Sequence, residues 1–350
     1  MEKSIGVAIV GGTGYGAGEL LRLLTAHPSA EVASVVSSSL AGEEITQAHP
    51  HLEGFYGGTF GAEFNVDDLA GYRHRVAFLC LPHGASGEAV KALFPVARSA
   101  NVKLIDLSGD LRLSDAEQRQ RNYPEAGVDA ELQAHFVYGL PELFRSQIAR
   151  ADAIANPGCY PTACSLAVAP LMDCEITGSI AFDAKSGSSG AGRNLQAGFH
   201  HPERHANVNA YKVLSHRHEA EIRQALGDPS GSVLATTFVP HVIPVSRGIY
   251  ATVHLELEQE MTTNELLLRY QEFYRESPFV RVRTDGVALE NVVGSNFCDV
   301  SVWARGRQVV ACAALDNLVK GMAGQAIQNM NSICGLPETT GLWQPALRPM

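Results

Sequence analysis

A glycine-rich stretch between an apolar segment and an amphipathic segment restricts most strongly how this chain can fold. Ile5 to Val10 is a short apolar run, and Gly11 to Gly18 contains five glycines. Glu19 to Leu24 has the apolar spacing of the start of an amphipathic helix. This order predicts a strand, a glycine turn and a helix, in which backbone N–H groups at the helix N-terminus can approach a phosphate group. A plain glycine-rich turn without a ligand is the alternative.

The rest of the first half alternates between β-type and helical patterns. Runs with strand character occur at Glu31 to Val36, Arg75 to Leu81 and Val102 to Leu107. Helical patterns at Ala85 to Ala97 and Ser114 to Arg121 lie between and after them. Such alternation is typical of a parallel, doubly wound sheet.

The pattern changes after residues 156–158, where longer alternating strands begin to dominate. They favour a mixed or antiparallel sheet with helices on one face. Asp316 to Ile333 is helical by pattern and is expected to pack back against the first domain. We predict an α/β protein with a Rossmann-type doubly wound domain (residues 1–156 and 317–350) and an α+β substrate or dimerisation domain (residues 157–316). The strands expected in the second domain are Gly178 to Ala184, Ser232 to Val239, Ile249 to Glu258, Asn296 to Arg305 and Gln308 to Leu315.

Length and charge exclude several classes of partner. At 350 residues the chain is longer than one hydrophobic core usually serves, which agrees with two domains. The formal net charge is −10 and no Lys/Arg run suited to duplex phosphates is present, so no nucleic-acid partner is expected. The start of the chain lacks signal-peptide features, and no apolar stretch reaches the roughly 18 residues of a spanning helix. We expect a cytoplasmic protein without a membrane partner.

The cysteines and histidines do not indicate a metal site. Seven cysteines form an odd number with no C-x-x-C pair, which indicates neither a disulfide framework nor a zinc site. His201 and His205 have H-x-x-x-H spacing, but Pro202 lies between them, and no H-E-x-x-H motif occurs. Six of the cysteines are expected to be small buried hydrophobes, because free cysteine is among the most buried residue types.

Cys159 has a different setting. It follows a Pro157-Gly158 turn and precedes small and apolar residues with helical potential. At a helix start, partial positive charge and unpaired N–H groups favour a thiolate and supply donors for an oxyanion on an attacked carbonyl. Cys159 is therefore a candidate nucleophile. On these residues alone, a packed cysteine in a tight turn is an equally good interpretation.

The turn after the second predicted strand bears on the choice between NAD and NADP. An acidic residue there normally binds the ribose 2′-hydroxyl of NAD. In this chain Val36 leads into Ser37-Ser38-Ser39, and the first acidic residue is Glu43. Serine hydroxyls can accommodate a 2′-phosphate, so NADP is the expected cofactor, although no Arg or Lys stands in that turn.

Seven motifs together resemble those of the N-acetyl-γ-glutamyl-phosphate reductases, in that family's order and over essentially the whole chain. The resemblance implies a glyceraldehyde-phosphate-dehydrogenase-like architecture, a homo-oligomer of two or four copies, and a step in arginine biosynthesis. It also implies NADPH-dependent reduction of N-acetyl-γ-glutamyl phosphate to N-acetylglutamate 5-semialdehyde and phosphate, through a thioester on Cys159. The motifs are Gly-x-Thr-Gly-Tyr at 11–15, Asp106 to Leu113, Asn156 to Ala163, Ser186 to Arg193, His216 to Ile222, Pro240 to Gly248 and Asn317 to Gly321.

The resemblance implies roles for further residues. A proton must move at the hemithioacetal oxygen, and both His216 and His218 are candidates for that transfer. Glu221 either orients an imidazole or caps the helix. Arginine forks suit a substrate that carries carboxylate and phosphate, and the expected substrate-binding residues are Ser108, Arg112, Asn156, Arg193 and Arg247. The expected dinucleotide-binding residues are Gly11, Thr13, Gly14, Tyr15, Gly16, Ala17, Ser37, Ser38, Pro82, Ser186, Gly187 and Asn317.

Three departures from the family pattern leave alternatives open. Ala17 stands where the family usually has its third glycine, and Gly18 follows it. An arginine common after the second strand is missing from residues 37–39. His200 to Arg204 resembles a segment of the reductase that takes carrier-protein-bound aminoadipyl phosphate in lysine biosynthesis, which keeps that activity as an alternative. An aspartate-semialdehyde dehydrogenase, and a dinucleotide sensor in which Cys159 is only structural, are two others.

Overall fold

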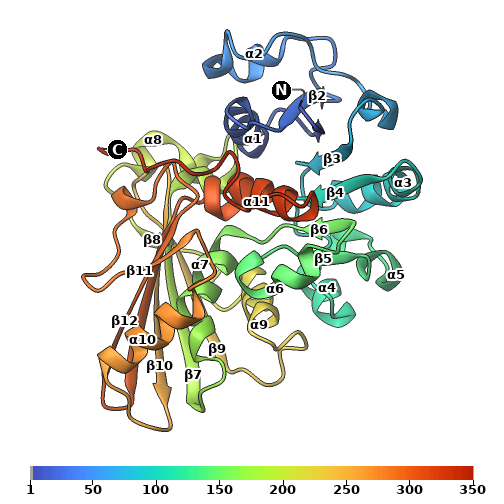
Figure 1. The fold of residues 1–350 in the computed structure, drawn as a ribbon. Coiled ribbons are helices and arrows are strands. Elements are labelled where there is room, and N and C mark those ends of the chain that lie inside the picture. Colours follow the sequence, from blue (N-terminus) through green and yellow to red (C-terminus); the bar gives the residue numbers. More distant parts are fainter. Residues whose placement is uncertain (1–2, 350) are drawn as a thin grey trace. The chain divides into compact units, whose positions relative to one another are not determined.

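The computed structural model describes residues 3–349, which form two compact units (Figure 1). The first unit contains the chain up to Pro157 and the returning segment Met322–Trp343. The second contains Gly158–Gly321 and the segment from Gln344 onward. No helix among residues 3–349 is long and apolar enough to cross a membrane.

The last part of the chain is divided between the two units, and this division differs from the predicted domain boundaries. Residues 317–350 were all expected in the first domain, whereas residues 317–321 and the segment from Gln344 belong to the second unit. The backbone N–H of Leu347 donates to the Val293 carbonyl oxygen at 2.8 Å, which attaches the terminal segment there.

The first unit contains a six-stranded sheet with strand order β2-β1-β3-β4-β6-β5, and all of its pairings are parallel. The strand β1 is buried along its whole length, as expected of a strand covered on both faces. The strands are β1 (Ile5–Val10), β2 (Ala30–Val36), β3 (His74–Leu79), β4 (Val102–Asp106), β5 (Phe136–Tyr138) and β6 (Ala153–Ala155).

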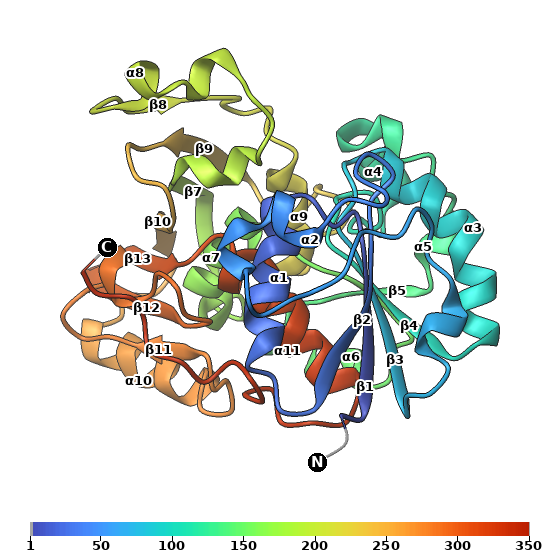
Figure 2. The same ribbon diagram turned by 90° about the horizontal axis from the view of Figure 1, so that it is seen from above.

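Helices cover both faces of this sheet. Figure 2 shows α1 (Tyr15–Thr25) and α11 (Gly324–Ile333) on one face and α3 (Ala85–Ser99) on the other. On its inner side α3 buries Val90 and Phe94 in an apolar cluster with side chains of the strands. This is the doubly wound arrangement that the sequence predicted. The shorter helices of this unit are α2 (Ile45–Ala48), α4 (Ala116–Asn122), α5 (Ala130–Gln133) and α6 (Pro141–Ile148).

The strand order reverses between β1 and β3, because the chain continues from β1 to β2 on one side and returns to β3 on the other. In open α/β sheets, ligands bind outside the carboxyl ends of the strands at such a point. The carboxyl end of β1 leads into the glycine turn, and that of β3 leads into Cys80 to His83. The N–H groups of Gly11 and Gly12 both donate to the Val36 carbonyl oxygen, at 3.0 and 2.8 Å, and fix the turn beside the end of β2.

The second unit contains a seven-stranded mixed sheet with strand order β11-β12-β13-β10-β7-β9-β8. The pairs β7–β9 and β11–β12 are parallel, and the other pairs are antiparallel. Its strands are β7 (Ile176–Ser186), β8 (Asn209–Ala210), β9 (Thr236–Val242), β10 (Ile249–Leu257), β11 (Val280–Val282), β12 (Cys298–Arg305) and β13 (Gln308–Leu315).

Helices pack on one face of this second sheet, as the alternating strand pattern predicted. The helix α7 (Cys159–Val168) packs against β10 and β13, and α10 (Thr263–Phe273) packs against β12. The Tyr270 hydroxyl on α10 donates to the Ala167 carbonyl oxygen on α7 at 2.6 Å, which joins the two helices. Alternate residues of β10 are buried, beginning with Ile249. The remaining helices of this unit are α8 (His201–Arg204) and α9 (His218–Ala225).

One predicted strand boundary is wrong for an identifiable reason. The strand expected from Ser232 begins only at Thr236. The buried Asp228 carboxylate accepts the backbone N–H groups of residues 231–234 at 2.8 to 3.1 Å. A chain curled around one carboxylate cannot at the same time pair with a neighbouring strand, so the strand starts after this turn.

Candidate active site

Cys159 is the first residue of α7, where the sequence predicted a helix start. Gly158 precedes it in extended conformation as the N-cap. The Cys159 side chain is half-buried, whereas Cys164 on the same helix is fully buried. Burial raises the pKa of the Cys164 thiol. Of the two cysteines on α7, Cys159 is therefore the one that a substrate can reach in a nucleophilic form.

The carboxylate of Glu221 connects the turn before Cys159 to one of the predicted histidines. Glu221 is fully buried on α9, and its Oε2 accepts the Gly158 backbone N–H at 3.1 Å. Its Oε1 lies 3.7 Å from Nε2 of His218, three residues earlier on the same helix. Glu221 thus faces both an imidazole and the turn before Cys159, which is the geometry that an orienting role requires, and that role stays a prediction.

Gly321 packs directly against the cysteine, and sequence reasoning gave it no role. A Cβ atom at Gly321 would lie 2.8 Å from the Cys159 Cβ, so a larger side chain would displace the cysteine. The residue lies within a π-helix, Val319–Ala323, where a continuous helix had been expected from Asp316. Single π-helical turns occur frequently at functional sites. The late Asn-Leu-Val-Lys-Gly motif was the signal that could have identified it.

The two predicted histidines have different surroundings. His218 faces the Glu221 carboxylate, whereas His216 uses its Nδ1 to accept the His218 backbone N–H at 3.2 Å. Burial, together with the nearby positive charges of Lys212 and Arg217, lowers the pKa of His216 to about 4. His216 is therefore uncharged at neutral pH, and His218 is the histidine placed beside a negative charge.

Two tyrosines complete the surroundings of the histidines and were not predicted. The Tyr160 hydroxyl donates to the His241 carbonyl oxygen at 2.9 Å, and the Tyr211 hydroxyl lies within hydrogen-bond distance, 3.3 Å, of the Tyr160 hydroxyl. Burial raises the pKa of Tyr160, and it raises the pKa of Tyr211 to about 12. Both hydroxyls therefore keep their protons at neutral pH. The position of Tyr160 directly after the cysteine was the available signal.

Three predicted dinucleotide-binding residues lie in the second unit, and one of them, Asn317, joins separate loops. Asn317 donates from Nδ2 to the Ser189 hydroxyl at 2.9 Å and accepts the Gly248 N–H through Oδ1 at 2.8 Å. The Ser186 hydroxyl donates to the Gly187 carbonyl oxygen at 3.0 Å. These contacts hold the loops after β7, β9 and β13 in one place.

The two predicted arginines of the second unit differ in their contacts. Nη1 of Arg247 lies 3.3 Å from Oδ2 of the fully buried Asp316. The Asp316 carboxylate also accepts the N–H groups of Gly294 at 2.7 Å and Leu318 at 2.8 Å. Arg193 is exposed. A substrate-binding role for either arginine stays a prediction.

Most glycines of the turn in the first unit are required by packing. Gly11 has a φ of +90°, and a Cβ there would lie 2.7 Å from the Cys80 carbonyl oxygen. A Cβ at Gly18 would lie 2.7 Å from Nδ1 of His49. Ala17, which stands at the family's usual third glycine position, is fully buried. The close packing that a third glycine normally provides is therefore supplied one residue later.

Gly14 is the exception in this turn. It is the N-cap of α1 with a φ of −78°, a conformation that any residue can adopt. A Cβ at Gly14 would meet no described atom within 4 Å, whereas one at Gly16 would lie 2.6 Å from Sδ of Met322. Thr13 and Tyr15 flank Gly14, and Tyr15 is exposed. The space in front of this helix N-terminus is therefore open to a ligand.

Ser37, Ser38 and Pro82 were predicted to bind the dinucleotide, and they follow the carboxyl ends of β2 and β3. Ser37 is buried, and its hydroxyl accepts the Leu40 N–H at 3.2 Å, whereas Ser38 and Ser39 are exposed. Pro82 follows β3 and is exposed just before α3 begins. The exposed serine hydroxyls are available to a ligand at the end of β2.

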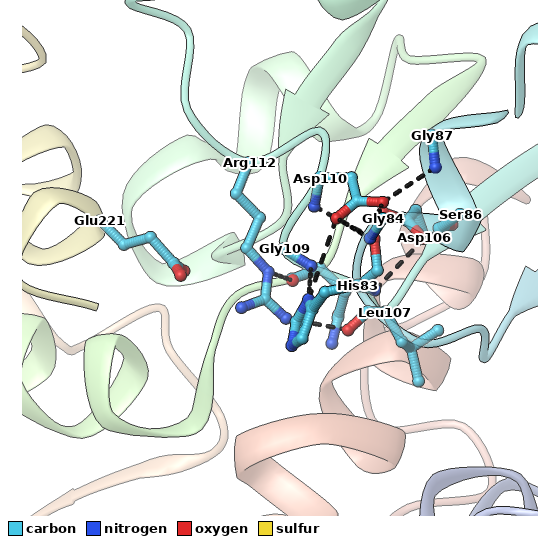
Figure 3. Close-up of polar contacts among 12 residues, drawn as sticks. His83, Gly84, Ser86, Gly87, Asp106, Leu107, Gly109, Asp110, Arg112 and Glu221 are labelled. Atoms are coloured by element: carbon cyan, nitrogen blue, oxygen red, sulfur yellow. Dashed lines mark hydrogen bonds and ion pairs between the residues drawn. The ribbon is translucent and has the colours of Figure 1, made fainter. Parts of the chain in front are cut away.

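A carboxylate of the protein occupies the N-terminus of α3. Figure 3 shows Oδ2 of Asp110 accepting the backbone N–H groups of Gly84 and Gly87, both at 2.9 Å. The Gly109 N–H donates to Nδ1 of His83 at 2.8 Å. Of these two helix N-termini, that of α3 is bound by a side chain of the protein and that of α1 is not.

Arg112 spans the carboxyl ends of two neighbouring strands. Its Nε donates to the Asn156 carbonyl oxygen at 2.7 Å. Its Nη2 donates to the Leu107 carbonyl oxygen at 2.9 Å (Figure 3). The Ser108 hydroxyl donates to Oδ2 of the buried Asp106 at 2.7 Å, and burial raises the pKa of that carboxyl. Ser108 and Asn156 are themselves buried, and their substrate-binding role stays a prediction.

No cluster of three or more His, Cys, Asp or Glu side chains suited to a metal ion occurs within residues 3–349.

Two family models match the chain, one for each unit. "Semialdehyde dehydrogenase, NAD binding domain" matches residues 6–151, which contain the glycine turn and most of the parallel sheet. "Semialdehyde dehydrogenase, dimerisation domain" matches residues 159–317, which begin at the candidate nucleophile.

Solved structures agree with this fold. Aspartate semialdehyde dehydrogenase II from Vibrio cholerae, complexed with ASA, superposes with a TM-score of 0.68 at 16% identity, covering 96% of this chain and 99% of that one. The Candida albicans aspartate semialdehyde dehydrogenase with NADP gives a TM-score of 0.65 at 14% identity, covering 96% and 99%. At such identities the likeness is one of fold.

Curated relatives are much closer in sequence, and each is named N-acetyl-gamma-glutamyl-phosphate reductase. The protein of Symbiobacterium thermophilum is 45% identical, covering 97% of both chains. That of Pelotomaculum thermopropionicum is 44% identical, covering 99% of this chain and 100% of the relative. That of Methanosarcina barkeri is 42% identical with the same coverage. The chain therefore belongs to the family of N-acetyl-γ-glutamyl-phosphate reductases.

Proposed function

We propose that this chain reduces N-acetyl-γ-glutamyl phosphate to N-acetylglutamate 5-semialdehyde with release of phosphate, a step of arginine biosynthesis. The observation that carries the proposal is the arrangement around Cys159. A half-buried cysteine begins a helix, and the turn before it is bound by a buried carboxylate that also faces His218. That arrangement suits acyl transfer through a thioester, and relatives that match this chain over nearly their whole length carry the name of this reductase.

The covalent step begins with the Cys159 thiolate. Its sulfur attacks the acyl carbon, the carbonyl electron pair moves to the oxygen, and the bond between the acyl carbon and the phosphate oxygen then breaks. The oxygen re-forms its double bond to carbon, phosphate leaves with the electron pair of the broken bond, and a thioester remains on Cys159. N–H groups of the first turn of α7 lie near the sulfur and favour its thiolate form. When bound, the reduced nicotinamide supplies the hydride that converts the thioester to the aldehyde.

Proton transfer is assigned to His218. In the oxidative direction the hemithioacetal hydroxyl must lose a proton as the hydride leaves, and in the reductive direction the same proton can be returned. The Glu221 carboxylate, 3.7 Å from Nε2 of His218, stabilises the imidazolium form that His218 has while it holds this proton. His216 is less suited to this role, because its pKa is about 4.

The cofactor is a nicotinamide dinucleotide, and we infer that it is NADP. The open space at Gly14, in front of the N-terminus of α1, fits a pyrophosphate that approaches the backbone closely. At the end of β2, where NAD-specific sites place an acidic residue, Ser38 and Ser39 are exposed. Hydroxyl groups there can bind a 2′-phosphate, and no carboxylate within residues 37–39 would repel it.

The second unit is proposed to pair with another copy of the chain. The helices α7 and α10 pack on one face of its sheet, and alternate residues such as Tyr250 and Thr252 lie on the other face, half-buried. The matching family model describes this part of the chain as a dimerisation domain. A homodimer or homotetramer remains the proposal, and the cytoplasmic location stays a prediction from the sequence.

The reaction itself is tested by a phosphate-dependent assay in the oxidative direction. We expect reduction of NADP with N-acetylglutamate semialdehyde, with kcat/KM at least about 100-fold higher than with aspartate semialdehyde or a carrier-bound aminoadipate semialdehyde. With NAD the rate should be lower. A preference for either other semialdehyde, or turnover that does not require phosphate, would contradict the proposed function.

Cys159→Ser should lower kcat by at least about 1,000-fold while dinucleotide binding stays nearly unchanged, because a serine hydroxyl is a far weaker nucleophile than a thiolate. Turnover and the dissociation constant of NADPH are measured in parallel. Cys174→Ser is the matched control, since Cys174 is a half-buried cysteine outside α7, and it should keep wild-type turnover. Retention of more than roughly a tenth of the rate in Cys159→Ser would exclude a thioester mechanism.

His218→Gln should lower kcat by about 100-fold or more and remove the acidic limb of the pH–rate profile for aldehyde oxidation. Glu221→Gln keeps an oxygen that can accept the Gly158 N–H but removes the negative charge beside the imidazole. Without that charge the imidazolium loses its proton more readily, so the acidic limb should move to lower pH. A limb at the same pH in both variants would show that another group carries the proton.

Gly14→Val and Gly11→Val provide a matched test of the dinucleotide site. The valine at Gly14 enters open space in an ordinary backbone conformation, so the melting temperature should stay within a few degrees while NADPH affinity falls about tenfold or more. The valine at Gly11 meets the Cys80 carbonyl oxygen at a φ of +90° and should lower the melting temperature. Unchanged NADPH affinity in Gly14→Val would show that the pyrophosphate does not bind at Gly14.

A further inference from the structure

The ring of His216 is held by contacts on several sides. Its centroid lies 4.7 Å from that of His218, 5.5 Å from those of Tyr211 and Phe238, and 5.8 Å from that of Tyr160. All four contacts are edge-to-face. A ring enclosed in this way has little freedom to rotate about its side-chain bonds, so its nitrogen atoms have fixed directions.

The hydrogen bond at Nδ1 determines which nitrogen carries the proton. The His218 backbone N–H donates to Nδ1 of His216 at 3.2 Å, so this nitrogen must present a lone pair. The neutral ring then has its hydrogen on Nε2. Among residues 3–349, no group accepts a hydrogen bond from that Nε2–H. His216 therefore offers one oriented donor that the protein itself does not use.

The charged and titratable groups around the ring keep it in this state. Lys212 and Arg217 disfavour a second positive charge, and burial does so more strongly. Tyr160 and Tyr211 are protonated at neutral pH, and the Tyr160 hydroxyl is already used as a donor to a backbone carbonyl. His218, on the remaining side, has the Glu221 carboxylate as its partner. The uncharged imidazole of His216 is thus a donor that does not give up its proton.

We propose that Nε2–H of His216 donates a hydrogen bond to the oxygen of the tetrahedral adduct on Cys159, while His218 moves the proton. This inference rests on the proposed function. When the sulfur attacks the acyl carbon, the carbonyl electron pair moves to the oxygen, and the His216 N–H stabilises that negative charge without transferring its hydrogen. When the oxygen re-forms its double bond, phosphate leaves with the electron pair of the broken bond, and His216 is unchanged.

The contact of both histidines with Tyr160 supports the assignment. Tyr160 follows Cys159 in the chain, and its ring contacts both histidines. A neutral imidazole suits an oxyanion donor, because a hydrogen bond from an uncharged group can be present throughout the cycle without a change of protonation. The two histidines then have separate tasks, which matches their separate partners.

A pair of amide substitutions tests the donor at Nε2. The amide nitrogen of glutamine can reach the place of Nε2, whereas that of asparagine reaches only the place of Nδ1. His216→Gln should keep at least about a tenth of kcat, and His216→Asn should lose about 100-fold, each with a KM within about twofold of wild type. Both variants should keep the acidic limb of the pH–rate profile, because His218 is intact.

Other kinetic outcomes would overturn the assignment. A rise in KM without a fall in kcat would place the donor on a distant part of the substrate. Loss of the acidic limb in both variants would make His216 the proton carrier. Equal losses in kcat for Gln and Asn would show that Nε2 has no special role. Binding of NADPH, measured in both variants, verifies that they are folded.

A second measurement does not depend on activity. Nitrogen-15 labelling of the histidines of the wild-type protein allows the His216 signals to be identified by their absence in His216→Gln. We expect the shifts of a neutral ring protonated at Nε2, with no titration between pH 6 and pH 8. A ring that titrates in this interval, or one protonated at Nδ1, would exclude the proposed donor even if the enzyme has the proposed activity. Absence of the reductase activity with these same shifts would instead count against the proposed function alone.

Discussion

The buried carboxylate of Glu221 is the interaction on which the reactive part of the second unit depends. A fully buried carboxylate is costly unless hydrogen bonds or an opposite charge offset its loss of water. Glu221 obtains the imidazole of His218 from its own helix and the N–H of Gly158 from the turn before α7, and the second partner is supplied only if α9 packs beside α7. The need to satisfy one acidic group thus fixes the position of His218, the proposed proton carrier, relative to the turn that presents Cys159.

Absence of side chains is a second constraint at the same cysteine. Gly321 belongs to a π-helical turn, and the space in which its Cβ would lie is taken by Cys159. In the glycine turn of the first unit, by contrast, packing requires some of the glycines but not all of them. Gly11 is required by its own conformation and its neighbours, whereas the fold imposes no such requirement at Gly14. A glycine that packing does not require is explained most simply by a ligand that approaches the backbone.

Local patterns in the sequence were sufficient for the doubly wound sheet and for the helix start at Cys159, because each depends on residues that are close together in the chain. They failed at Ser232, where the Asp228 carboxylate binds the backbone that would otherwise extend the strand. They also could not separate His216 from His218, since the difference arises from contacts with Tyr211 and Glu221. Partners of this kind are brought together only by folding.

Two cations, Lys212 and Arg217, affect the protonation of His216, and cations near a site in general also attract an anionic substrate. Lys212 and Arg217 lower the pKa of the imidazole, and a bound phosphate or carboxylate near them would offset that effect. The substrate could then be expected to charge the ring. Burial, however, is the largest cause of the low pKa, and a substrate that excludes water from the site would strengthen it. Because burial is the larger effect, we expect His216 to stay an uncharged donor when the substrate is bound.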